Sequence, residues 1–238
     1  MLILILIAAA IGKGFICKGM GFMNTAGPEG HQAVAVRSQS DMSAFFNCRL
    51  NGYQDTLYTH SYNQFFSNCL ISGTIDFIFG HAAVILQNCR IVVRKPMANQ
   101  FNTVTADGRE QQDQPTGTII HGGVITAEAA LEPEKFNFKS YLGRPWKKHA
   151  RTVVMETKIG DVIRPEGWTI WQGESFHQTC YYAEYNNAGP GANTANRATW
   201  AKKSIDRNEA MQYTVGTFLK GADWVAASGA RYINGLRH

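Results

Sequence analysis

FFNCRLNGYQDTLY at residues 45–58 is followed by two partial copies of itself, FSNCLISGTIDFIF at 66–79 and LQNCRIVVRK at 86–95. Aligned on their Asn-Cys pairs, the three segments start about 20 residues apart. A period of about 20 residues, built from short apolar runs that Gly and Asn interrupt, is typical of a solenoid in which each repeat forms one coil.

The apolar runs of this chain favour one type of solenoid over another. They lack the LxxLxL pattern of leucine-rich repeats and are rich in β-branched and aromatic residues. The clearest runs are AVAVR (33–37), FIFG (77–80), AVILQ (83–87), IVV (91–93) and TVVME (152–156). Short strands of this composition predict an all-β fold, a parallel β-helix, in a single domain over residues 1–238.

Two of the aligned columns are expected to be structural. They consist of Asn47, Asn68 and Asn88, and of Cys48, Cys69 and Cys89. Equivalent residues of successive coils stack at the strand spacing of about 4.8 Å. We therefore expect the cysteines to stack inside the coil as small apolar side chains, a frequent position for free thiols. A disulfide between Cys48 and Cys69 remains open, and the asparagines are expected to form an amide ladder at the turns.

A third column contains two carboxylates, Asp55 and Asp76, each three residues after a glycine (Gly52 and Gly73). Two stacked carboxylates repel each other, which raises the pKa of one and leaves the other ionised. Such a pair can serve as an acid and a nucleophile. The alternative is two exposed turn aspartates without a role, but Asp76 lies in the apolar context TIDFIFG, where an unpaired carboxylate is costly.

The overall charge and the N-terminus narrow the function classes. The net charge is +5 and the pI about 9.0, which favours a polyanionic partner, either an acidic polysaccharide or a nucleic acid. The sequence contains no zinc-finger spacing, RNA-binding aromatic signature or basic helix. The apolar run at 1–11 is too short to span a bilayer. We interpret residues 7–11 as a strand; the alternative is the apolar part of a secretory signal, which no Lys or Arg precedes.

Four motifs together resemble a known family. HQAVAVR (31–37), GYQDTLY (52–58), GTIDFIFG (73–80) and YLGRPWK (141–147) are similar, in order and spacing, to signature segments of the plant pectin methylesterases (pectinesterases). The resemblance extends from about Ala8 to the C-terminus. It implies a right-handed parallel β-helix with short C-terminal helices. The implied reaction removes methyl esters from pectin, a methyl-esterified polygalacturonate, and yields methanol and pectate.

The resemblance also implies a role for each residue that matches a family motif. Asp76 corresponds to the nucleophile, Asp55 to the general acid and then base, and Arg144 to the residue that orients the nucleophile. The oxyanion and the sugar rings would be contacted by Gln54, Gln32, Trp146, Phe79 and Trp171. Phe79 is also expected to pack in the core. No cofactor and no metal are implied.

Members of the family act in the plant cell wall, so the resemblance implies an extracellular location. It also implies pectin as a partner and a proteinaceous pectinesterase inhibitor as a second partner. Nucleic acid and membrane are not expected. N-terminal coils and a cap of the family have no counterpart here, which predicts lower stability, association or an incomplete groove. The alternatives are an inactive truncated relative that binds pectin, and a retaining glycosidase with two carboxyls about 5 Å apart. Methanol release separates them.

Overall fold

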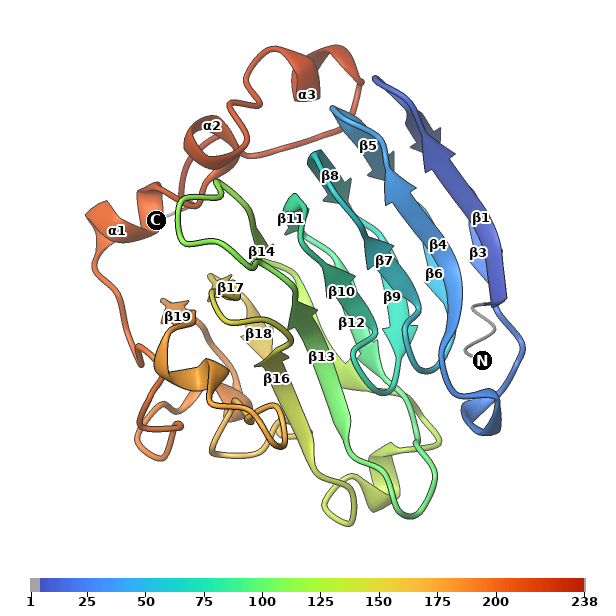
Figure 1. Ribbon diagram of the computed structural model, residues 1–238, viewed down its shortest axis with the longest axis vertical. Helices are drawn as coiled ribbons and strands as arrows, with labels where there is room; N and C mark the ends of the chain where they lie inside the picture. Colours follow the sequence, from blue (N-terminus) through green and yellow to red (C-terminus); the bar gives the residue numbers. More distant parts are fainter. Residues whose placement is uncertain (1–4, 238) are drawn as a thin grey trace.

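The computed structural model describes residues 5–237, which form a β-helix of three parallel sheets (Figure 1). The chain visits the sheets in turn, so each coil adds one strand to each sheet. The first sheet contains β1 (Ile5–Ile11), β4 (Ala33–Gln39), β7 (Leu57–Thr59), β10 (Ile78–Gly80), β13 (Asn102–Asp107) and β16 (Ser140–Pro145).

The other two sheets continue the coil. The second sheet contains β2 (Ile16–Lys18), β5 (Ser43–Phe46), β8 (Asn63–Ser67), β11 (Ala83–Gln87), β14 (Gly117–His121), β17 (Arg151–Met155) and β19 (Tyr181–Tyr185). The third sheet contains β3 (Gly21–Met23), β6 (Arg49–Asn51), β9 (Leu70–Gly73), β12 (Arg90–Val93), β15 (Val124–Ala127) and β18 (Lys158–Ile159). All of these pairings are parallel, which confirms the predicted fold.

The helical elements are short, as expected. They are η1 (Pro28–Gly30), η2 (Glu132–Glu134), η3 (Phe176–Gln178), η4 (Pro190–Ala192), α1 (Arg207–Met211), α2 (Val215–Phe218) and α3 (Trp224–Ala227). No helix in the described part of the chain is long and apolar enough to cross a membrane. The strand predicted at 7–11 lies within β1, and residues 1–4 of the apolar run lie outside the described residues.

The interior of the coil is built from the stacked columns that the repeat predicts. The three cysteines of the column are each 1% exposed, and all five cysteines of the chain are free, so no Cys48–Cys69 disulfide forms. Phe45 and Phe66 stack with ring centroids 4.7 Å apart. Such dry, regular stacking of apolar side chains is the main source of stability in a solenoid.

The asparagine column has a different basis from the expected amide ladder. The three residues have φ of 56°, 52° and 56°, in the left-handed region that asparagine tolerates better than most residues. Backbone N–H groups make the coil-to-coil bonds, from Asn47 to Ser67 and from Asn68 to Gln87. The asparagines therefore stabilise the turn conformation. The prediction of an amide ladder was wrong, because backbone groups and not side-chain amides bond from coil to coil.

The C-terminal segment covers the outer face of the second sheet (Figure 1, red). An apolar cluster joins this face to the helices through Phe65, Ile85, Val215 and Leu219, among others. The Gln87 side chain donates to the Ile233 carbonyl (2.9 Å) and accepts from the Ile233 N–H (2.6 Å). The C-terminal segment thus occupies this sheet face.

Candidate active site

A cleft of about 280 Å³ lies on the outer face of the first sheet. Its lining brings together all eight residues that the sequence nominated, together with Ala106. They are Gln32, Gln54, Asp55, Asp76, Phe79, Arg144, Trp146 and Trp171. These residues come from five separate stretches of the chain, and the parallel stacking of coils places them on one surface.

Asp76 is held on several sides. Arg144 Nε donates to Asp76 Oδ1 (2.8 Å) and Nη2 donates to Oδ2 (2.6 Å), a bidentate pair. Thr103 Oγ1 donates to Asp76 Oδ1 (2.6 Å) and accepts from the Asp76 backbone N–H (2.8 Å). Because Asp76 is only 6% exposed, this fork compensates a negative charge that would otherwise be costly to bury.

Asp55 lies beside it in a different electrostatic environment. The pKa of Asp55 is raised to about 8, mainly by burial and also by the neighbouring Asp76, while Arg144 opposes the shift. A carboxyl with such a pKa is mostly protonated at neutral pH. The raised pKa of Asp55 is the shift expected for one member of a stacked carboxyl pair.

Matched turns produce this pair. Leu57 of β7 and Ile78 of β10 are in register, so the aspartates two residues before them occupy equivalent positions of successive coils. Both have left-handed backbones, with φ of 65° at Asp55 and 49° at Asp76. Gly73 makes the turn possible, because a Cβ there would lie 2.6 Å from the Tyr53 carbonyl oxygen. Such strained backbone is characteristic of functional sites.

Two side-chain amides face the same cleft. Gln32 follows η1, and Gln54 precedes Asp55 in the turn before β7. Within the described part of the chain, neither amide has a side-chain hydrogen-bond partner. Their N–H groups are thus available as donors to a ligand atom in the cleft.

Aromatic rings form the walls of the cleft. The Arg144 guanidinium lies over the Trp171 ring, 4.2 Å from its centroid, so Trp171 both lines the cleft and fixes the cation. Phe79 and Trp146 meet edge to face at 6.0 Å. Phe79 is 7% exposed and also stacks on Tyr58 at 4.4 Å. It therefore packs with other side chains as expected, but on the outer face of the sheet.

Three residues of the site were missed by the sequence analysis. Thr103 bonds Asp76, Tyr58 extends the aromatic wall, and Phe101 lies 5.5 Å from the Arg144 guanidinium. Tyr58 could have been found, since it is in register with Phe79. Thr103 and Phe101 follow a loop that breaks the 20-residue spacing, so no column points to them. Among residues 5–237, no group of three or more His, Cys, Asp or Glu side chains is arranged to hold a metal ion.

The fold and this cleft together define a parallel β-helix protein with a paired-carboxyl site. Residues 6–222 match the family model described as Pectinesterase, and the chain belongs to that family. One similar relative, "Probable pectinesterase/pectinesterase inhibitor 13" of Arabidopsis thaliana, is 55% identical over 229 residues. The match covers 95% of this chain and 37% of the relative, so the chain spans well under half of that protein's length.

Solved structures give the same family. A pectin methylesterase from carrot superimposes with a TM-score of 0.94 at 48% identity, over 96% of this chain and 72% of that one. A pectin methylesterase in complex with a hexasaccharide has a TM-score of 0.73 at 26% identity, over 91% of this chain and 72% of that one. The close agreement with the structure of the carrot pectin methylesterase confirms the β-helix for nearly all of the chain.

Proposed function

We propose that this chain is a carboxylic ester hydrolase that removes methyl esters from methyl-esterified polygalacturonate, with Asp76 as nucleophile and Asp55 as general acid and base. The observation that supports it best is the environment of the two carboxyls. Asp76 is buried and paired with Arg144, while the pKa of Asp55 is raised to about 8.

In the first half-reaction, an Asp76 carboxylate oxygen attacks the carbonyl carbon of the methyl ester. The amide N–H groups of Gln32 and Gln54 are the available donors for the oxyanion that forms. As the carbon–methoxy bond breaks, Asp55 donates its proton to the departing oxygen, because methoxide is a poor leaving group. The products of this step are methanol and an anhydride between Asp76 and the sugar carboxyl.

In the second half-reaction, the ionised Asp55 accepts a proton from a water molecule that attacks the sugar acyl carbon of the anhydride. The bond from that carbon to the Asp76 oxygen breaks, which regenerates the Asp76 carboxylate. Arg144 and Thr103 already donate to this carboxylate, so it is a good leaving group. Asp55 ends the cycle protonated, and one water has been consumed for each methanol released.

Two other functions use the same fold. A retaining glycosidase also needs two carboxyls about 5 Å apart, but the unpartnered amides of Gln32 and Gln54 favour an acyl oxyanion over a sugar oxocarbenium ion. A binding protein without catalysis would have no use for a proton on Asp55 at neutral pH. The cleft favours ester hydrolysis over both.

The substrate and its setting are part of the proposal. The Phe79, Trp146 and Trp171 rings suit the apolar faces of sugar rings, and the net charge of +5 suits an acidic polymer. A hexasaccharide is bound in one solved member of the family. We place this activity in the plant cell wall, where such a polymer occurs, with a proteinaceous inhibitor as a second partner.

Methanol release from highly methylated pectin tests the proposal. We expect Asp76→Asn to lower the rate by about 10³- to 10⁴-fold, as loss of a nucleophile does, without new reducing ends in either protein. Asp223→Asn is the matched control, because it makes the same change at an exposed position outside the cleft. A folded parent that releases no methanol, or equal rates in parent and Asp76→Asn, would refute the assignment.

A further inference from the structure

The outer face of the third sheet presents a row of cations remote from the cleft. Arg49 is in register with Leu70, Leu70 with Arg90, Arg90 with Val124, and Val124 with Lys158. The row thus alternates a cation with an apolar residue. With one strand every 4.8 Å or so, the three charges lie about 10 Å apart along a line.

The charges of this row have no counter-charge paired with them among the described residues. Arg49, Arg90 and Lys158 are exposed. Within the described part of the chain, none of their head groups has a hydrogen bond, ion pair or ring contact. Elsewhere, cations such as Arg94, Lys135 and Arg197 are paired with carboxylates. Three free cations at regular spacing create a local positive field that suits a linear polyanion.

A hollow of about 580 Å³ adjoins the row, with Arg90 and Leu70 in its lining. Its floor is the next outward row of the same sheet, where Asn51, Ser72 and Val92 stand in register. Ser72 Oγ donates to Asn51 Oδ1 (2.9 Å), and the Asn51 amide N–H groups have no acceptor among residues 5–237. Amide and hydroxyl groups next to apolar positions suit the hydroxyls and C–H faces of a sugar chain.

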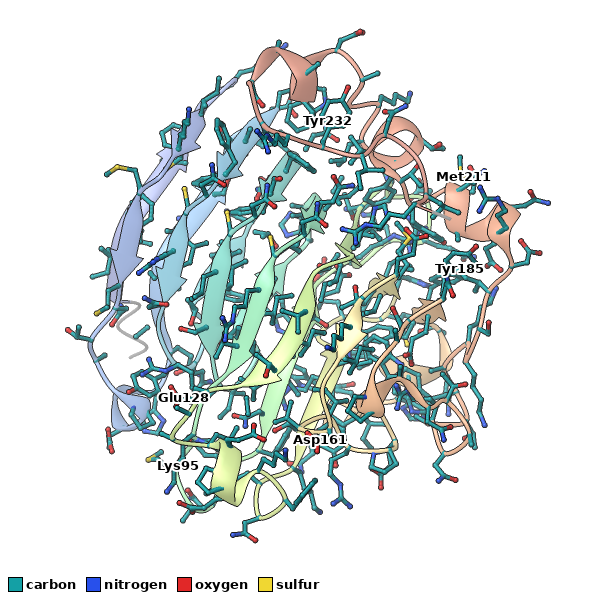
Figure 2. The ribbon with its side chains drawn as sticks, turned by 180° about the vertical axis from the view of Figure 1, so that it is seen from behind. Lys95, Glu128, Asp161, Tyr185, Met211 and Tyr232 are labelled. Carbon is teal, nitrogen blue, oxygen red and sulfur yellow. The ribbon has the colours of Figure 1, made fainter. Side chains whose placement is uncertain are left out.

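Acidic and aromatic groups at the hollow are already engaged. Glu128, labelled with Lys95 in Figure 2, accepts from Arg94 Nε (3.1 Å) and the Lys95 backbone N–H (2.7 Å). The one aromatic lining residue, Tyr53, is covered by the Arg94 guanidinium at 3.9 Å. No other aromatic ring is present among the described residues that line the hollow, which disfavours stacking on a base and therefore single-stranded nucleic acid as the ligand.

We propose that this face, Arg49, Arg90 and Lys158 with the adjoining hollow, is a second binding site for a linear polyuronate. The choice of a polyuronate among polyanions rests on the proposed function, because ester removal turns a neutral substrate into such a polymer. The site lies on a different sheet from the cleft, so it can hold a de-esterified stretch of polymer while another stretch occupies the cleft.

Binding of fully de-esterified oligogalacturonate, measured by titration calorimetry, tests this site. The variant Arg49→Gln/Arg90→Gln/Lys158→Gln is expected to bind about tenfold more weakly and with a smaller salt dependence. The control Lys13→Gln/Lys203→Gln/Lys220→Gln removes the same charge from exposed positions elsewhere and is expected to bind like the parent. In a Trp146→Ala background, which impairs the cleft, the tenfold loss should persist, because separate sites act additively.

Three results would overturn the inference. Equal losses in both triple variants would mean that only net charge matters, and disappearance of the loss in the Trp146→Ala background would place all binding in the cleft. A selective loss of duplex DNA binding, with polyuronate binding unchanged, would assign the face to nucleic acid. If the parent releases no methanol but the triple variant of this face still loses polyuronate binding selectively, the second site stands and the proposed function is refuted. If the parent releases methanol but the triple variant shows no selective loss, the proposed function stands and the second site is refuted.

Discussion

Asp55 and Asp76 occupy the same position of successive coils, follow matched glycines and share a left-handed backbone. Their surroundings nevertheless differ. Asp76 receives hydrogen bonds from Arg144 and Thr103, whereas Asp55 has a raised pKa, caused mainly by burial. One repeated turn therefore yields two carboxyls with opposite chemical properties.

The difference arises from later coils. Thr103 belongs to β13 and Arg144 to β16, the next two strands of the first sheet beyond Asp76. Asp55 lies one coil further away from both. A solenoid can thus duplicate a carboxylate by repetition and then distinguish the copies by what is stacked on one side of them.

The largest effect that would break this comparison is expected for Arg144→Ala. Without the fork, Asp76 is left as a buried carboxylate with reduced compensation, and the proposed nucleophile is no longer oriented. We expect methanol release to fall by about 10³-fold. Arg144→Lys keeps the charge without the planar fork and should fall between parent and Arg144→Ala. Parent-like rates in Arg144→Ala would show that Asp76 does not need the Arg144 fork.

A second prediction concerns the stability contributed by Asp55. Its pKa is raised to about 8 in the folded chain, above an ordinary value of about 3.9. The folded state therefore holds a proton that the unfolded state releases, and the parent loses stability as pH rises from about 4 to about 8. Asp55→Asn has no such proton, so its free energy of unfolding does not fall in this way. At pH 9 we expect its free energy of unfolding to exceed that of the parent by about 2 to 5 kcal/mol.

Denaturant unfolding of both proteins at pH 4 and pH 9 measures this difference. Asp223→Asn, at an exposed position, controls for the general effect of removing one carboxylate. A stability difference that stays constant between the two pH values would mean that Asp55 has an ordinary pKa in the folded chain.

The smallest effect is expected for Thr103→Val, which removes both hydrogen bonds between the Thr103 hydroxyl and Asp76 and preserves the shape of the side chain. The Arg144 fork remains, so we expect methanol release to fall only about tenfold. Thr118→Val is a comparison at a second buried carboxyl group, since Thr118 donates to Asp107 (3.1 Å), which does not line the cleft. Thr118→Val should leave the rate of methanol release unchanged. Equal rates of methanol release in the parent and in Thr103→Val would show that Thr103 does not contribute to the site.

Much of this architecture could be predicted from the spacing of a few residues. The aligned columns gave the parallel coils, the buried cysteines and the pair Asp55 and Asp76, because a constant period puts equivalent residues in register. Arg144 came from its motif, since nothing in the repeat indicates which later strand faces Asp76. Thr103 was missed because the loop between β12 and β13 changes the spacing from 21 residues to 27 between Asp76 and Thr103.

The asparagine turns show a second limit. The sequence correctly marked the positions of Asn47, Asn68 and Asn88, but not the reason for them. Their side chains were expected to bond from coil to coil, yet the backbone makes these bonds. Residue identity alone does not distinguish a side chain that bonds a neighbour from one that tolerates a left-handed backbone.

The central claim is that Asp55 is protonated at neutral pH beside its repeat partner Asp76, which Arg144 and Thr103 bond. Carbon-13 NMR of the chain labelled at the aspartate carboxyls, titrated from pH 3 to pH 10, tests it most directly, with Asp55→Asn and Asp76→Asn used to assign the two resonances. The account predicts that the Asp55 resonance titrates near the value of about 8 and is absent in Asp55→Asn. An Asp55 resonance that titrates near its ordinary value of about 3.9 would contradict it.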